Sequence, residues 1–63
     1  MPFSDNLTRM LKDRGITVYR LAQDIGVPKS TVYTWTSGQK NPSAEHVLKV
    51  AKYLGVQMEV LLQ

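Results

Sequence analysis

The stretch Val18–Ser37, VYRLAQDIGVPKSTVYTWTS, decides the fold of this chain. Two short helical patterns meet in it at Gly26. In the first pattern, apolar residues recur at the spacing that gives a helix one buried face, at Val18, Leu21, Ala22 and Ile25. A second helix is predicted to begin almost at once, because Pro28 suits the first position of a helix. Its apolar residues are only Val32 and Trp35, so most of its surface is polar.

Gly26 and Ala22 meet the two steric demands of a tight helix-turn-helix. Helices joined by a turn of three or four residues cross closely, which requires a small residue at the crossing and a left-handed residue in the turn. A residue other than glycine in the left-handed conformation costs about 1 to 2 kcal/mol, a serious fraction of a small domain's stability. Apolar residues are predicted to fill the wedge between the two helices: Leu21, Ile25, Val27, Val32 and Trp35.

Two more helices are predicted near the ends of the chain. The first is expected at about residues 4–14, capped by Ser4 and stopped by Gly15, with an apolar stripe of Phe3, Leu7, Met10 and Leu11. The last is expected at about residues 58–62, with one apolar face made by Met58, Leu61 and Leu62.

A further helix, at about residues 43–54, has two candidate starting points. Either Ser43 caps it, or Asn41 does so with Pro42 at the first helical position. It is expected to end at Gly55 and to bury Ala44, Val47, Leu48, Ala51 and Leu54. No stretch alternates as a strand does, so the chain is predicted to be all-α, with five short helices at about 4–14, 18–25, 28–37, 43–54 and 58–62.

Length and composition narrow the class of protein. The 63 residues are predicted to form one domain, residues 1–63, with a small apolar core that no disulfide braces because the chain has no cysteine. No apolar run approaches the roughly 20 residues of a membrane span, so a soluble, cytoplasmic protein is expected. The net charge of +3 fits a polyanionic partner without demanding one.

The sequence offers no catalytic or metal-binding constellation. The five acidic residues are scattered, no nucleophile is paired with a base, and His46 has no cysteine or second histidine with which to share a metal. The protein is therefore predicted not to be an enzyme and to need no cofactor. Trp35 could stack on bases, but its spacing from Val27 and Val32 favours packing in the core.

From about Phe3 to Leu62 the chain resembles the helix-turn-helix domains of the phage-repressor and Cro type. The matching residues are Leu21, Ala22, Ile25, Gly26, Val27, Ser30, Thr31, Val32, Trp35, Gly38, Asn41, Pro42, Ser43, Leu48, Ala51, Leu54, Gly55 and Val56. The resemblance implies a five-helix fold whose third helix enters the major groove of DNA while the second lies across the backbone. It also implies a bacterial or phage-encoded transcriptional regulator, for which a repressor is expected and an activator stays open. This regulator is expected to bind a two-fold operator in double-stranded DNA as a weak homodimer formed mainly on the DNA.

The resemblance also locates the contacts with DNA. Base contacts are expected on the recognition helix, at Lys29, Ser30, Tyr33 and Thr34. Phosphate contacts are expected from the start of the second helix, from the recognition helix and from the loop after it, at Thr17, Arg20, Thr31, Ser37, Gln39, Lys40 and Asn41. For Tyr33 and Arg20, plain exposure to solvent is the alternative. No base-contacting side chain has the two-pronged hydrogen bonding of arginine or glutamine, so no base is predicted.

Two positions depart from the pattern of the family. Many relatives begin the second helix with a glutamine that grips a phosphate, and this chain has Val18 there. Many relatives pair a glutamate near the end of the recognition helix with an arginine on the first helix, and this chain has Thr36 facing Leu11. The fold is expected to survive both changes, with a weaker hold on phosphates.

Two alternatives stay open on partners. Met58, Val60 and Leu61 are predicted to form a small two-fold dimer contact, or else this end packs on the first helix or on a further C-terminal domain absent from this chain. The competing interpretation of the whole chain is a helical protein-interaction module, such as an antitoxin-like partner, because a fold alone does not fix function.

Overall fold

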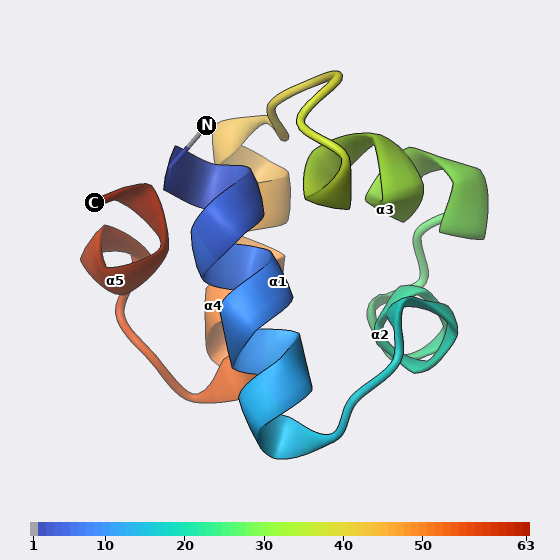
Figure 1. Ribbon diagram of the computed structural model, residues 1–63, viewed down its shortest axis with the longest axis horizontal. Coiled ribbons are helices and arrows are strands. Elements are labelled where there is room, and N and C mark those ends of the chain that lie inside the picture. Colours follow the sequence, from blue (N-terminus) through green and yellow to red (C-terminus); the bar gives the residue numbers. More distant parts are fainter. Residues whose placement is uncertain (1) are drawn as a thin grey trace.

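A computed structural model describes residues 2–63 of the chain, which form five α-helices and no strand. The helices are α1 Pro2–Arg14, α2 Val18–Ile25, α3 Lys29–Thr36, α4 Ala44–Leu54 and α5 Met58–Leu62. In Figure 1, α1 runs in front of α4, with α5 on one side and the pair α2 and α3 on the other. The predicted all-α class with five short helices is confirmed. No helix among the described residues combines the length and the apolar character needed to cross a membrane.

The turn between α2 and α3 has the geometry that the sequence predicts. Gly26 takes the left-handed conformation, with φ of 73°, and its N–H donates to the carbonyl of Ala22. The N–H of Val27 donates to the same carbonyl at 3.1 Å, so the end of α2 is closed by two backbone hydrogen bonds. The chain then turns sharply, and Figure 1 shows α2 almost end-on while α3 runs across the view. The tight helix-turn-helix is therefore present.

The first helix begins two residues earlier than predicted, and Ser4 does not cap it. α1 starts at Pro2, a residue suited to a first helical position, and Ser4 is buried inside the helix. Its hydroxyl lies beside the turn after α3, since a Cβ built on Gly38 would lie 3.5 Å from the Ser4 hydroxyl oxygen, an ordinary van der Waals distance.

Two other boundaries sharpen the predictions. α3 spans Lys29–Thr36 rather than residues 28–37, because Pro28 keeps an extended ψ of 139° and stands just before the helix. α4 begins after Ser43, whose hydroxyl accepts a hydrogen bond from the N–H of His46, so Ser43 and not Asn41 is the cap.

The predicted apolar faces of α4 and α5 are each wrong at one or more positions. Val50 is fully buried in α4, whereas Leu48 is 42% exposed and Ala44 is exposed as well. The buried side faces both α2 and α5, which rotates the stripe towards Val50. In α5 only Leu61 is buried, and Leu62 is 53% exposed.

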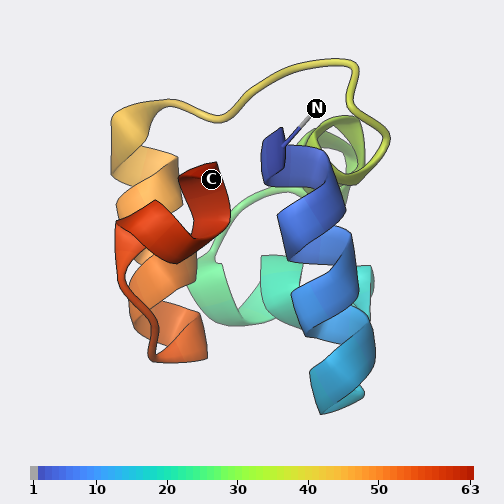
Figure 2. The same ribbon diagram turned by 60° about the vertical axis from the view of Figure 1, so that its left-hand side comes forward.

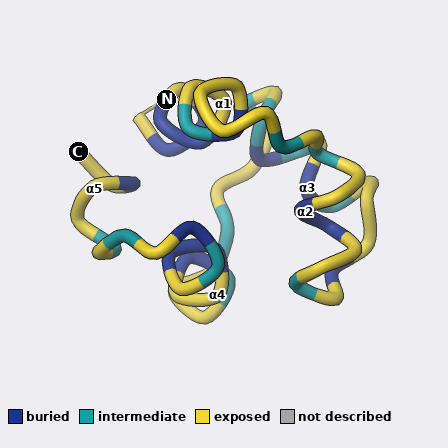
Figure 3. Tube along the Cα trace, turned by 90° about the horizontal axis from the view of Figure 1, so that it is seen from below, coloured by how far each residue is buried: buried dark blue, intermediate teal, exposed yellow. Residues whose placement is uncertain are grey.

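The core lies between the helices, on their inward sides, as the buried segments in Figure 3 show. Figure 2 shows α5 lying against α4 near the start of α1. The side-chain amide of Asn6 on α1 is buried and donates to the carbonyls of Leu61 at 2.9 Å and Gln63 at 3.2 Å. At the other end of α1, Arg14 donates to the carbonyl of Leu54. Polar side chains of α1 thus satisfy carbonyls at the ends of α4 and α5.

Candidate nucleic-acid interface

Two side chains fix α3 to the body of the protein. Val32 is fully buried and Trp35 is 2% exposed. The Trp35 ring meets Phe3 edge-to-face, with ring centroids 6.4 Å apart, and the ring of His46 at 5.3 Å. This confirms that Trp35 packs in the core rather than standing ready to stack on bases. On the rest of the helix circumference Lys29, Ser30 and Tyr33 are exposed, and the threonines are half-buried.

The face formed by α3 and the loop after it is positively charged because this part of the sequence contains no acidic residue. Between Asp24 and Glu45 the chain carries Lys29 and Lys40 but no acidic residue. Both lysines are exposed, one at the start of α3 and one in the loop that follows it. The helix and its loop therefore present positive charge alone, as a surface for a polyanion requires.

At the start of α2, Thr17 offers a hydrogen-bond donor. Its hydroxyl oxygen accepts the backbone N–H of Arg20 at 3.0 Å, which caps the helix as predicted. Because the oxygen uses a lone pair to accept this bond, the hydroxyl hydrogen remains available to donate to another group. A phosphate oxygen can only accept, so Thr17 has the polarity that a phosphate contact needs. The next residue, Val18, is half-buried and adds no polar group from its side chain.

Arg20 is held by a carboxylate that the sequence did not single out. Its Nε donates to Asp24 at 2.9 Å on the same helix, and the hydroxyl of Tyr53 on α4 donates to the same carboxylate oxygen at 2.5 Å. The Tyr53 hydrogen bond, with the help of Arg20, lowers the pKa of Asp24, and the carboxylate in turn raises the pKa of Tyr53. Arg20 remains 66% exposed at its side chain, so its terminal nitrogens still reach solvent.

Lys29 has a neighbour that sequence reasoning also missed. Its Nζ lies 5.5 Å from the centre of the Tyr19 ring, within the range of a cation–π contact. Tyr19 is 59% exposed, so this contact lies on the surface where α2 meets the start of α3. Spacing along the sequence gives no sign of the pair, because the two residues belong to different helices.

Three hydroxyls along α3 and its end share one arrangement. Thr34 Oγ1 donates to the carbonyl of Thr31 at 2.5 Å, Thr36 Oγ1 to that of Tyr33 at 3.2 Å, and Ser37 Oγ to that of Thr34 at 3.3 Å. Each hydroxyl reaches back three residues along the helix. Their hydrogens are therefore directed into the helix backbone rather than outwards.

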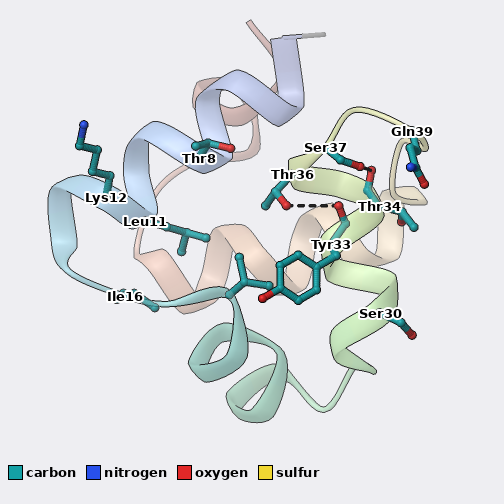
Figure 4. A pocket seen from close by; sticks show the side chains of 11 residues that line it. Thr8, Leu11, Lys12, Ile16, Ser30, Tyr33, Thr34, Thr36, Ser37 and Gln39 are labelled. Carbon is teal, nitrogen blue, oxygen red and sulfur yellow. Dashed lines mark hydrogen bonds between the residues drawn. The ribbon is translucent and has the colours of Figure 1, made fainter.

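An open hollow of about 770 Å³ lies between α1, the start of α2, and α3. In Figure 4 the Tyr33 ring extends from α3 over this hollow towards the start of α2, and the ammonium of Lys12 points away from it. Leu11 and Thr36, which the sequence comparison with the family expects to face each other, both line this hollow. The hollow also gathers residues predicted to contact DNA: Ser30, Tyr33, Thr34, Ser37 and Gln39.

The remaining predicted residues lie around this face or apart from it. Gln39, Lys40 and Asn41 are exposed in the loop beyond α3, and Thr31 is half-buried on the helix. The predicted dimer residues lie on α5, where Met58 is half-buried, Val60 is 38% exposed and Leu61 is fully buried. Leu61 thus offers no side-chain surface to a second copy. Within residues 2–63 no group of histidine and acidic side chains could hold a metal ion.

Comparison with known proteins agrees with this geometry. The family model of the Cro/C1-type HTH DNA-binding domain matches residues 6–63. The fold is similar to a crystal structure of a transcriptional regulator from Listeria innocua, with a TM-score of 0.85 and 29% sequence identity. That alignment covers 94% of this chain and 55% of the regulator, so this chain spans about half of the regulator's length. No curated protein sequence matches significantly.

Proposed function

This chain belongs to the Cro/C1-type helix-turn-helix DNA-binding domain family, and we propose that it binds double-stranded DNA sequence-specifically and acts as a transcriptional repressor. The observation that carries the proposal is the position of α3. The helix is anchored by Val32 and Trp35 on one side and presents Lys29, Ser30, Tyr33 and Thr34 on the others. An exposed helix of this kind is what the major groove admits.

In the proposed complex, α3 lies in the major groove and α2 lies across the backbone. Lys29 donates to guanine O6 or N7, and Tyr33 and Ser30 contact neighbouring base edges. The hydroxyl hydrogen of Thr17 meets a phosphate at the start of α2. Further phosphate contacts are made by six residues: Arg20, Thr31, Ser37, Gln39, Lys40 and Asn41.

The proposal includes a weak homodimer formed mainly on the DNA. Its contact is proposed on α5, where Val60 is exposed and Met58 is half-buried. Two copies on a two-fold operator would place the two recognition helices about 34 Å apart, one turn of DNA. Because so few apolar atoms are available there, the dimer is expected to form at the operator rather than free in solution.

The test starts with selection of bound duplexes from a random pool, which gives half-site, symmetry and spacing together. On the selected operator, Lys29→Ala and Thr34→Ala should each weaken binding by about 1 to 3 kcal/mol while the circular dichroism of the folded chain is unchanged. Lys52→Ala is the matched control, since it removes the same charge from the exposed side of α4.

Two outcomes would contradict the proposal. If both recognition-helix variants bound normally while Lys40→Ala abolished binding, α3 would not be the base-contacting helix. If random duplex at low salt were not bound at tens of micromolar protein, the protein-interaction alternative would be favoured, because non-specific affinities of DNA-binding proteins lie at about 10⁻⁴ to 10⁻⁶ M.

A further inference from the structure

The hydrogen bond from Thr34 to the carbonyl of Thr31 fixes which way the Thr34 hydroxyl is polarised. The two oxygens lie 2.5 Å apart, and the carbonyl has no hydrogen, so the hydroxyl must be the donor. A hydroxyl has one hydrogen and two lone pairs. Once its hydrogen is directed to the carbonyl of Thr31, Thr34 can present only lone pairs to anything outside the helix.

The base edges in the major groove differ in what they offer to such an acceptor. Guanine shows two acceptors, N7 and O6, and thymine shows the acceptor O4 and a methyl group. Adenine and cytosine each show an exocyclic amino group, N6 or N4, which donates. Each base pair therefore shows one amino group in the major groove, beside acceptors of the same pair. An acceptor at Thr34 can bond to that amino group, whereas a bond to guanine O6 or N7 or to thymine O4 forms only if the bond to Thr31 is broken.

We propose that Thr34 is a base-contacting residue that accepts a hydrogen bond from the exocyclic amino group, adenine N6 or cytosine N4, of one base pair in each half-site. The inference rests on the proposed function, in which α3 enters the major groove. It goes beyond that function by naming the chemical group of the base pair that Thr34 contacts and the direction of the hydrogen bond.

The other polar side chains of this surface differ from Thr34 in whether they can donate or accept a hydrogen bond. The contact with the amino group is therefore assigned to Thr34 alone. Lys29 carries donors only and favours guanine. Ser30 makes no side-chain hydrogen bond among those found in the described residues, so its hydroxyl can donate or accept. Thr17 accepts from the helix backbone and is left with a donor, the opposite of Thr34. The Ser37 bond is longer, at 3.3 Å, and exposed, so that hydroxyl is more easily turned towards a phosphate.

The experiment compares duplex selection by the wild-type chain, Thr34→Val and Thr34→Ser. Valine keeps the shape of threonine without its oxygen, and serine keeps the oxygen without the methyl group. The base pair whose preference flattens with Thr34→Val is the one that Thr34 contacts, and its adenine or cytosine carries the amino group proposed to donate to Thr34. Thr34→Ser should keep that preference. The identity of the base distinguishes the adenine and cytosine forms of the proposal.

Base analogues then test the amino group alone. Replacing the selected adenine by purine, or the selected cytosine by 2-pyrimidinone, removes only the exocyclic amino group. Wild-type binding should fall about five- to tenfold, and Thr34→Val should bind both duplexes equally. Thr36→Val is the control, because Thr36 makes the same backbone contact but is expected to face Leu11 across the hollow. Its selection profile should match that of the wild type.

Unchanged wild-type binding to the duplex that lacks the amino group, or no flattening at any position, would overturn the proposal. Lys29→Ala separates these outcomes from a failure of the proposed function. If Lys29→Ala still weakens operator binding, α3 lies at the DNA and only the role of Thr34 is wrong. If no duplex is selected at all, the proposed function fails and the inference fails with it.

Discussion

Helices α2 and α3 have the same length, eight residues, but they are held in place by different means. α2 has a side-chain cap at Thr17 and a left-handed glycine at its end. α3 has no side-chain cap, and its hydroxyls bond back to its own carbonyls. Helices this short are unstable alone, so α3 depends on the packing of Trp35 and Val32. The helix proposed to contact bases is therefore the one fixed by tertiary packing, which leaves its outer surface free for DNA.

Removing the anchor of α3 should have the largest effect. Trp35→Ala is expected to lower the free energy of unfolding by about 3 to 5 kcal/mol, because it empties the space between Phe3 and His46. A chain of this size has about 3 to 9 kcal/mol in all, so the variant should be largely unfolded. Urea unfolding followed by circular dichroism measures the change. Tyr33→Ala on the exposed side of α3 is the control, and an equal loss in both variants would refute the anchoring role.

The left-handed end of α2 should give the next largest effect. Gly26→Ala is expected to cost about 1 to 2 kcal/mol of folding free energy through backbone conformation alone, because a Cβ there meets nothing within 4 Å. Thermal unfolding measures it, with the exposed Gln23→Ala as the comparison. A loss well above this range would mean that the residue also contacts a neighbour.

Removing the cap of α2 tests the contrast between the two helices most directly. Thr17→Ala should lower stability by about 1 kcal/mol, and Thr17→Ser should restore it, because serine caps as well as threonine. Thr34→Val, which removes a hydroxyl that makes no cap, should change stability by less. In binding to random duplex the order should be the same, since of these two residues only Thr17 is proposed to hold a phosphate. The reverse order in either measurement would show that the two hydroxyls had been assigned the wrong roles.

The smallest effect is expected at the contact between α2 and α4. The lowered pKa of Asp24 means that its hydrogen bonds favour the folded state above pH 3.8, the ordinary value, and that this contribution is lost as the pH falls through the lowered pKa. The raised pKa of Tyr53 means that its contribution holds below pH 10.0 and is lost as the pH rises through the raised value. Tyr53→Phe should flatten both slopes slightly in thermal unfolding at a series of pH values. An unchanged profile would mean that the contact does not form in solution.

The elements that the sequence predicts correctly are those set by local chemistry. Thr17, Ser43 and Gly26 fix helix ends through contacts with residues no more than four positions away. The spacing of Val32 and Trp35 likewise correctly predicts which side of α3 is buried. Where these local rules apply, the observed helix bounds lie within two residues of the predicted ones.

The sequence-based predictions are wrong or incomplete where contacts between residues far apart in the sequence determine the structure. Ser4 is buried beside the turn at Gly38, which no pattern within α1 can reveal. Val50 replaces Leu48 in the core because α4 packs on two helices at once. Tyr53 reaches Asp24 across 29 residues. The polarity of Thr34 depends on a side-chain rotamer, and threonine alone is equally able to donate or accept.

The buried position of Trp35 also gives the protein an optical reporter of its own. The chain contains one tryptophan, and that residue lies on the inner side of the helix proposed to contact bases. Its emission should shift to the red whenever α3 leaves the body of the protein, with no label attached. A duplex bound to the outer side would not touch the indole. A change of emission on adding DNA would therefore report a change in how α3 packs on the rest of the protein, and not contact between the indole and a base.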